Sequence, residues 1–220
     1  MRVTLIQETP NPIKTIAQIA SICYDSDPKN PLGLVKHLYR NGHHSVFEHI
    51  YFTFKIEGIS RACSHQIVRH RMCAFTQRSQ RYCSEDGFGY VQPDTVGTRT
   101  YEDFMKSVRE EYDLLQRLRV PNEDARYVLP NACETSLYLS CNLRELIHIA
   151  NERLCSRAQW EIRKMVSLMV SLVDESIRWM LVPKCQSGFL VCNTPCAQVS
   201  KYADKECLKE TVKPVLKEAT

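Results

Sequence analysis

The segment QIVRHRMCAFTQRSQRY, residues 66–82, is the part of the sequence around which the rest is organised. No carboxylate occurs between Glu57 and Glu85, although this stretch is rich in guanidinium groups. Its five arginines are Arg61, Arg69, Arg71, Arg78 and Arg81. A guanidinium pairs with phosphate or carboxylate through a planar fork of N–H donors. The cluster therefore predicts anions from elsewhere, either a ligand or acidic residues distant in sequence.

A helix over residues 61–72 would give this segment a functional face. Gln66, Arg69 and His70 lie three and four residues apart, so they would share one side of such a helix. That side would offer an amide, a fixed cation and a titratable imidazole together. The same spacing also fits a solvated basic helix or an interface with acidic residues, and spacing alone leaves both interpretations open.

Length and composition place the chain among ordinary globular proteins. It has 220 residues, 44% of them hydrophobic and 25% charged, which suits one domain with a sizeable core. The net charge of +4 fits an anionic small molecule at least as well as a nucleic acid. No apolar run is long enough to cross a bilayer, and the first residues do not resemble a secretory signal. We therefore expect a cytoplasmic protein with no membrane and no nucleic-acid partner.

Eleven cysteines are an unusually high number. Their odd count and irregular spacing argue against a disulfide framework, so most are expected to be small buried hydrophobes. Cys192 and Cys196 form a C-x-x-x-C pair in the tail, which is a weak zinc signal. His44, Glu48 and His49 do not have the HExxH spacing. No metal site is expected, and a zinc-stabilised interaction protein remains one alternative, beside an arginine-rich nucleic-acid binder.

The hydrophobic pattern predicts an α+β fold with a central, mostly antiparallel sheet covered by long helices. The expected strands are 1–7, 50–57 (ended by Gly58) and 134–141, with an irregular loop over 75–82 and a short strand at 90–91. The expected helices are 12–23, 31–38, 59–72, 100–118, 121–130, 142–153 and 158–181. Asn11 and Asn142 are expected to cap the helices that follow them, with Pro12 at the first helical position, and Phe104 and Tyr112 are expected to face the core. We expect one catalytic domain over residues 1–182 and a Cys-containing C-terminal extension over 183–220.

The arginine-rich segment resembles a known signature. Arg69-His70-Arg71, seven further residues and Ser79 are similar to the RHR signature of the flavin-dependent thymidylate synthases. Three other segments resemble that family: NGHHSVFEH (41–49), DARYVLP (124–130) and RLCSRAQWEI (153–162). The resemblance covers roughly residues 30–165. Two departures are Thr76-Gln77, where family members often have Asn-Glu, and Ala74, where a serine is common.

The resemblance implies an enzyme that converts dUMP to dTMP. FAD would be its cofactor, methylenetetrahydrofolate its carbon donor and NADPH its reductant, in a homotetramer with active sites at subunit interfaces. The family needs no protein nucleophile, so Cys73, Cys83 and Ser79 are not expected to attack the substrate. An arginine beside the pyrimidine ring NH would favour the deprotonated ring.

The resemblance also implies roles for individual residues. The catalytic residues would be Arg153 and His43. The flavin contacts would be Ser45, Glu48, Arg69, His70, Arg71, Gln77, Asn142, Arg144 and His148. The nucleotide contacts would be Gln66, Arg69, Gln77, Arg78, Ser79, Gln80, Arg81, Arg126 and Arg153.

Overall fold

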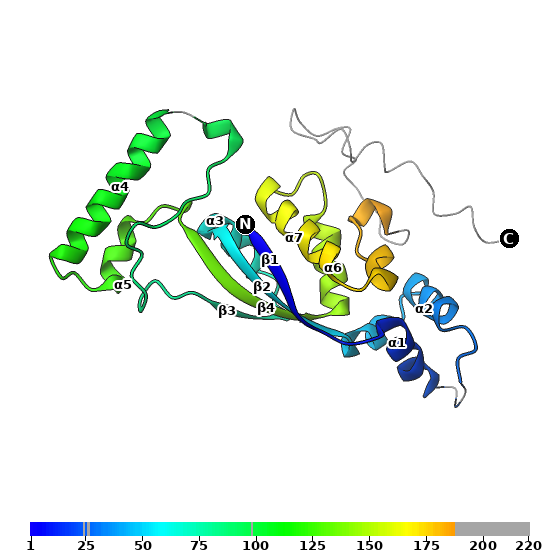
Figure 1. The fold of residues 1–220 in the computed structure, drawn as a ribbon. Coiled ribbons are helices and arrows are strands. Elements are labelled where there is room, and N and C mark those ends of the chain that lie inside the picture. Colours follow the sequence, from blue (N-terminus) through cyan, green and yellow to red (C-terminus); the bar gives the residue numbers. More distant parts are fainter. Residues whose placement is uncertain (24, 26, 98, 188–220) are drawn as a thin grey trace. The chain divides into compact units, whose positions relative to one another are not determined.

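The computed structural model describes residues 1–23, 25, 27–97 and 99–187. Four strands form one antiparallel sheet in the order β1-β2-β4-β3 (Figure 1). They are β1 (Arg2–Glu8), β2 (Tyr51–Ser60), β3 (Cys73–Gln77) and β4 (Glu134–Asn142). The α-helices are α1 (Pro12–Ser21), α2 (Pro31–Arg40), α3 (Arg61–Ile67), α4 (Arg99–Arg117), α5 (Asn122–Ala125), α6 (Leu143–Arg153) and α7 (Trp160–Leu172). The 3-10 helices are η1 (His44–His49), η2 (Asp94–Val96), η3 (Arg126–Val128), η4 (Glu175–Met180) and η5 (Lys184–Gln186).

The chain divides into two compact units. The first contains Met1–Arg2, Lys55–Arg69 and Phe75–Leu139, and in it α4 packs against α5 and η3. The second contains Val3–Phe54, His70–Ala74 and the chain from Ser140 onward. In the second unit α1 packs against α2, and α6 packs against α7 and η1. Each unit holds a separate set of the residues that the sequence singles out.

The two inner strands owe their pairing to alternating burial. Phe52, Phe54 and Ile56 are buried at every second position of β2. Leu137, Leu139 and Cys141 repeat the pattern in β4. Because strand side chains alternate between faces, one face of each strand joins the core. The sheet, its antiparallel sense and its two best strands agree with the sequence prediction.

Capping residues fix where the helices begin. Asn30 Oδ1 accepts a hydrogen bond from Gly33 N at the start of α2, and Asn142 Oδ1 accepts one from Glu145 N at the start of α6. Asn142 was predicted as a cap and is confirmed as one. Asn11, by contrast, precedes α1 in a left-handed conformation with no side-chain cap, so only the Pro at the first helical position acts as expected.

Three local predictions are wrong. The basic helix ends at Ile67 instead of Met72, so Gln66, Arg69 and His70 do not share a helix face. β3 covers Cys73–Gln77, so a strand occupies residues 75–77, where an irregular loop was expected. A five-residue strand with mixed polarity carries too weak an alternation to be recognised.

The expected helix over 158–181 is also interrupted. α7 ends at Leu172, Val173 is extended, and Asp174 Oδ1 then caps η4 by accepting from Ser176 N. The sequence did not reveal this break, because Asp174 lies within a largely apolar run that was predicted as one helix. In α4, Tyr112 is buried as predicted, but Phe104 is exposed in this chain.

Two expectations concern the chain as a whole, namely the absence of a membrane span and the division into a domain and an extension. Within residues 1–187, apart from the undescribed positions 24, 26 and 98, no helix has the length and apolar character that a membrane span needs. Residues 188–220, with Cys192 and Cys196, lie outside the described residues. The division into residues 1–182 and an extension from 183 stays a prediction.

Gly58 provides a test of the strand pairing. It does not end β2 as predicted but lies inside it with φ of +67°, and a Cβ there would lie 3.2 Å from the backbone nitrogen of Met1. Gly58→Ala should therefore lower the free energy of unfolding by about 1–2 kcal/mol or more, measured by denaturant titration. Gly87→Ala is the control, because its φ is +61° but its Cβ would meet nothing within 4 Å. Equal losses in both variants would contradict the proposed contact at Gly58.

Candidate active site

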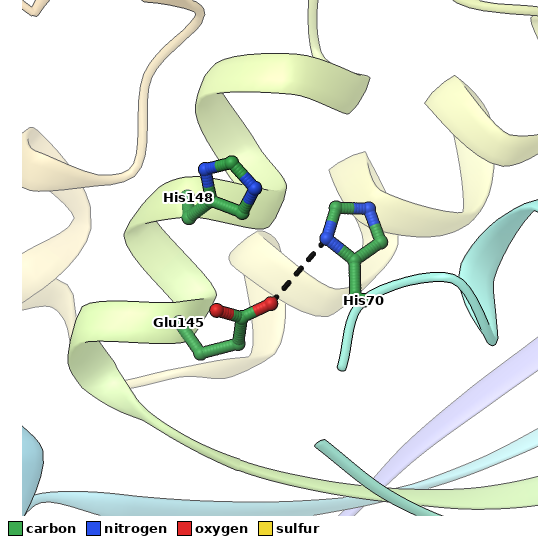
Figure 2. Close-up of side chains that lie close together, drawn as sticks. All are labelled: His70, Glu145 and His148. Carbon is green, nitrogen blue, oxygen red and sulfur yellow. Dashed lines mark ion pairs between the residues drawn. The ribbon is translucent and has the colours of Figure 1, made fainter. Parts of the chain in front are cut away.

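His70 lies between two charged side chains of the second unit. The Nε of Arg153, at the end of α6, donates a hydrogen bond of 3.0 Å to His70 Nε2. On the other side of the ring, His70 Nδ1 lies 3.4 Å from Oε1 of Glu145. Figure 2 shows Glu145 and His148 projecting from α6 toward His70, which comes from the segment that precedes β3. The structure thus brings together two segments that are 83 residues apart in sequence.

The protonation state of His70 follows from its surroundings. Burial, the Arg153 guanidinium and the His148 ring together lower the pKa of His70 from 6.5 to about 4. The imidazole is therefore neutral at pH 7, and its contact with Glu145 joins a neutral ring to a carboxylate. Because Nε2 accepts from Arg153, the single ring proton is on Nδ1, which faces Glu145. Burial in turn raises the pKa of Glu145.

An exposed polar face runs along the first turns of α6. Arg144 and His148 are four residues apart and exposed, whereas Leu143, Leu146 and Ile147 between and beside them are buried. Arg144 Nη1 donates to Glu48 Oε1, which connects α6 with η1. His43 and Ser45, at the start of the same 3-10 helix, are exposed as well. Four of the predicted flavin contacts of this unit, Ser45, Glu48, Arg144 and His148, therefore lie on η1 and on α6, which pack together.

In the first unit two arginines converge on one acidic residue. Arg81 approaches Glu123 Oε2 with Nε at 3.1 Å and Nη2 at 2.9 Å. Arg126 Nε donates to the backbone carbonyl of Glu123 at 3.0 Å. The sequence also offers Asp124 as a neighbour for Arg126, but the structure shows no ion pair between these two described residues. Both side chains of the Arg81–Glu123 pair are about half exposed, so the arrangement remains open to an incoming anion.

Other predicted nucleotide contacts hold the first unit together. Gln77 Nε2 donates to Ser64 Oγ at 3.0 Å and to Thr135 Oγ1 at 3.2 Å, and so links α3, β3 and β4. Gln80 is buried, and its amide donates to Cys133 Sγ at 3.8 Å. These contacts favour a structural role for both glutamines in this chain.

Three further predicted nucleotide contacts, Arg78, Ser79 and Gln66, make hydrogen bonds with residues close to them in sequence. Arg78 Nε donates to Glu85 Oε1 at 3.2 Å, and its Nη2 donates to the backbone carbonyl of Ser84. Ser79 Oγ accepts from Arg81 N at 3.2 Å, which stabilises the turn. Gln66 Nε2 donates to Ala62 O within α3.

Arg69 and Arg71 remain available for a ligand. Both are exposed, and neither makes a hydrogen bond or an ion pair with any residue in the described part of the chain. Arg69 belongs to the first unit and Arg71 to the second. The deficit of anions predicted from sequence is therefore met by the nearby Glu85 for Arg78 and by the distant Glu123 for Arg81, but not for the two arginines of the RHR triplet.

Sequence reasoning missed the acidic partners. Glu145 and Glu123 were not singled out, because each is distant in sequence from the group it meets, and Glu85 was noted only as the end of the stretch without carboxylates. For Glu145 a signal existed: it stands three residues before His148, which places both on one side of a helix. The Arg81–Glu123 pair depends on the tertiary fold and has no local signal.

Comparison with known proteins identifies the family. The family model described as thymidylate synthase complementing protein matches residues 4–177. A flavin-dependent thymidylate synthase of Geobacter sulfurreducens is 42% identical over 190 residues, which cover 79% of this chain and 82% of the relative. One of Pyrococcus furiosus is 39% identical over 216 residues, which cover 86% and 88%. The chain belongs to the flavin-dependent thymidylate synthase family.

A solved structure supports the fold. The crystal structure of thymidylate synthase X from Helicobacter pylori with FAD and dUMP has a TM-score of 0.73 to this chain at 20% sequence identity. The match covers 82% of this chain and 97% of that one. The α+β fold, the family and the assignment as a flavin-dependent thymidylate synthase, all expected from the RHR signature and its companion segments, are thereby confirmed. The roles of individual residues stay predictions.

The lowered pKa of His70 predicts a pH-dependent stability. The native state binds fewer protons than the unfolded chain wherever pH lies between the two pKa values of this histidine. The free energy of unfolding should therefore fall as pH drops from about 6.5 to about 4, and this loss should be complete below the lower value. His70→Gln, whose amide oxygen can still accept from Arg153, should flatten the profile in this range. Denaturant titrations at several pH values measure it.

The control for this prediction is His65→Gln, which replaces an exposed histidine of α3. It separates the effect of the site from that of the substitution itself. A His70→Gln profile that keeps the wild-type slope between pH 4 and pH 6.5 would contradict the assignment of a low pKa to this ring.

Proposed function

We propose that the protein catalyses the reductive methylation of dUMP to dTMP, with methylenetetrahydrofolate as carbon donor, NADPH as reductant and FAD as cofactor. The methylene group must gain two electrons to become a methyl group, and oxidation of NADPH to NADP⁺ provides them, so that the folate leaves as tetrahydrofolate. FAD, when bound, supplies the redox chemistry that connects the two. The observation that carries the proposal is the hydrogen bond between Arg153 and His70, because it joins the two most specific family segments.

The second unit offers residues that fit a flavin. Arg144 and His148 present a cation and an imidazole on the exposed side of α6, and Glu48 adds an acceptor. A flavin dinucleotide carries an anionic diphosphate and a ring edge with both donors and acceptors, so this mixed set is chemically suitable. Arg71, exposed and unpaired within the described residues, adds a further cation. These residues would bind and orient the cofactor.

The first unit offers residues that fit the nucleotide phosphate. Arg81 pairs with the carboxylate of Glu123 and Arg126 donates to its backbone carbonyl, so both arginines contact one residue and one carboxylate already occupies the place of an anion. A phosphate carries more charge and more acceptor oxygens than a carboxylate. It would therefore compete with Glu123 for Arg81. Arg69, which is exposed, is a further candidate for nucleotide binding.

Arg153 would act on the pyrimidine. A fixed cation beside the ring NH stabilises the deprotonated ring and thereby raises its electron density. His70 orients this cation without neutralising it, because the imidazole is uncharged at pH 7. His43, exposed before η1, is the second residue proposed near the reacting atoms.

Two buried cysteines, Cys133 and Cys141, are unsuited to act as nucleophiles. Burial raises the pKa of Cys133 to about 11. The hydrogen bond with Cys73, followed by burial, raises the pKa of Cys141 as well. The thiolate is the nucleophilic form, so neither thiol is activated at neutral pH.

We further propose a cytoplasmic homotetramer with active sites at subunit interfaces. Large exposed aromatic residues next to the predicted nucleotide residues support an assembly. Tyr82, beside Arg81, is 79% exposed, and Tyr127, beside Arg126, is 84% exposed. Exposed aromatic groups of this size often mark protein–protein contacts. Light scattering of the purified protein tests the assembly, and a monomeric mass would contradict it.

The first test of the function is spectroscopic. Purified protein, reloaded with FAD if necessary, should show flavin absorbance near one equivalent per chain, and dUMP should accelerate oxidation of NADPH. Addition of methylenetetrahydrofolate should then yield dTMP, measured by chromatography. Arg153→Gln should lower the rate of dTMP formation on the order of 10²-fold while flavin remains bound, since a fixed cation at a developing charge contributes about that much. Absence of flavin binding would overturn the proposal.

Glu123 supplies a test of the phosphate site. Glu123→Gln should lower the KM for dUMP by up to about fivefold, because it removes the carboxylate that competes for Arg81. Arg81→Gln should raise the KM by about tenfold or more, as expected for the loss of a charge-assisted hydrogen bond. The matched control is Glu110→Gln, which removes an exposed carboxylate from the Lys106 pair of α4 in the same unit. A higher KM in Glu123→Gln would contradict the competition.

A further inference from the structure

Glu145 occupies an unusual place for a carboxylate. It lies in the first turn of α6 and is only 8% exposed, yet nothing in the proposed reaction assigns it a role. Its nearest polar contact from another element is His70 Nδ1 at 3.4 Å. The opposite nitrogen of that ring accepts from Arg153. The three side chains therefore form a continuous row: carboxylate, imidazole, guanidinium.

The order of this row has a chemical consequence. A neutral imidazole carries its proton on one nitrogen only, and the other nitrogen is then an acceptor. Arg153 can donate to His70 only if the proton is on Nδ1. A negative charge beside Nδ1 stabilises that tautomer, and in its absence the proton can move to Nε2, where it would face the guanidinium N–H. The partner of one ring nitrogen thus decides what the other can bind.

The other groups that face His70 do not replace Glu145. His148, whose ring centroid is 5.4 Å from that of His70, is exposed and meets the ring edge to face. Arg153 is a cation, and Arg69 and Arg71 on either side of His70 in the chain point to solvent as exposed cations. Glu145 is therefore the only carboxylate in contact with His70 among the residues the structure describes.

We propose that Glu145 is a positioning residue for the pyrimidine-binding arginine: its carboxylate fixes the Nδ1–H tautomer of His70, and the free Nε2 then holds the Arg153 guanidinium in place. This assignment rests on the proposed role of Arg153 and extends it by one residue that the resemblance does not supply. The contact holds a cation with an acceptor that is neutral at pH 7 and so adds no negative charge beside it.

A metal ion is the competing interpretation of the same cluster. Ligand atoms of His70, Glu145 and His148 lie within 4.8 Å of one another. Metal binding through His70 Nδ1 would move its proton to Nε2 and remove the hydrogen bond from Arg153, and a divalent cation would be repelled by the adjacent guanidinium. The hydrogen bond from Arg153 to His70 Nε2 and the approach of the Glu145 carboxylate to Nδ1 favour the arrangement without a metal.

The tautomer can be measured directly. Wild-type enzyme labelled with ¹⁵N in its histidine rings, and examined by solid-state NMR with His70→Gln as the assignment control, should show a protonated Nδ1 and an unprotonated Nε2 for His70 at pH 7. A proton on Nε2 would overturn the proposal. This measurement needs neither substrate nor a destabilised variant, so it remains decisive if Glu145→Ala fails to fold, and it is independent of the proposed function.

The functional consequence is tested by comparing variants of Glu145. Glu145→Ala should lower kcat/KM for dUMP on the order of 10- to 100-fold, the range typical of a lost partner that orients a functional side chain. Glu145→Gln, which keeps a carbonyl acceptor for Nδ1–H, should restore part of the loss. Glu152→Gln, which removes an exposed carboxylate from the same helix, should behave as wild type.

The pH dependence of ligand binding distinguishes the positioning role proposed for Glu145 from a merely structural role. 5-Fluoro-dUMP has a more acidic ring NH than dUMP, so a correctly placed Arg153 should favour it increasingly as pH rises. Glu145→Ala should lose this increase, as Arg153→Gln does, with flavin content unchanged. Retention of the wild-type pH dependence in Glu145→Ala, or a stoichiometric metal lost in that variant, would overturn the proposal. Absence of dUMP binding in the wild type would instead refute the proposed function.

Discussion

The pairing of β2 with β4 is the constraint on which the rest of the structure depends. Arg61 N donates to Cys133 O at one end, and Leu143 N donates to Ile50 O at 2.7 Å at the other. Because side chains alternate between faces, a shift of one residue would turn every buried group of a strand outward. The core therefore fixes the register, and the register fixes where α3 and α6 begin. The functional side chains are placed by backbone hydrogen bonds several residues away from them.

The arginines have partners of different chemistry. Arg81 and Arg144 each pair with a half-exposed glutamate, a carboxylate that an anionic ligand could displace. Arg153 donates to an imidazole that is neutral at pH 7. This contact orients the cation without placing a negative charge beside it. In the proposed function, the two carboxylate-paired arginines bind anionic ligands, whereas Arg153 acts on the pyrimidine.

The features predicted correctly from the sequence are those that depend on local patterns of residues. Alternation identified the strands around Phe54 and Leu139, and Asn142 was recognised as a cap because its side chain acts within one turn. The family was recognised from contiguous segments. By contrast, the end of α3 depends on the start of β3, a short strand that is stable only beside β4. Glu123 and Glu145 were missed because their partners come from other segments, and spacing along the chain carries no information on such contacts.

The first turn of α6 connects helix capping with the position of Arg153. A glutamate three residues after an asparagine cap usually folds back to the cap's own N–H, which explains its presence without any function. Glu145 does donate its backbone N–H to Asn142, but the contact of its carboxylate is with His70. The helix N-terminus stabilises this negative charge despite burial, because its N–H groups point toward it. A capping position thereby supplies a buried carboxylate, the carboxylate orients an imidazole, and the imidazole orients Arg153, so that helix geometry determines where the cation lies.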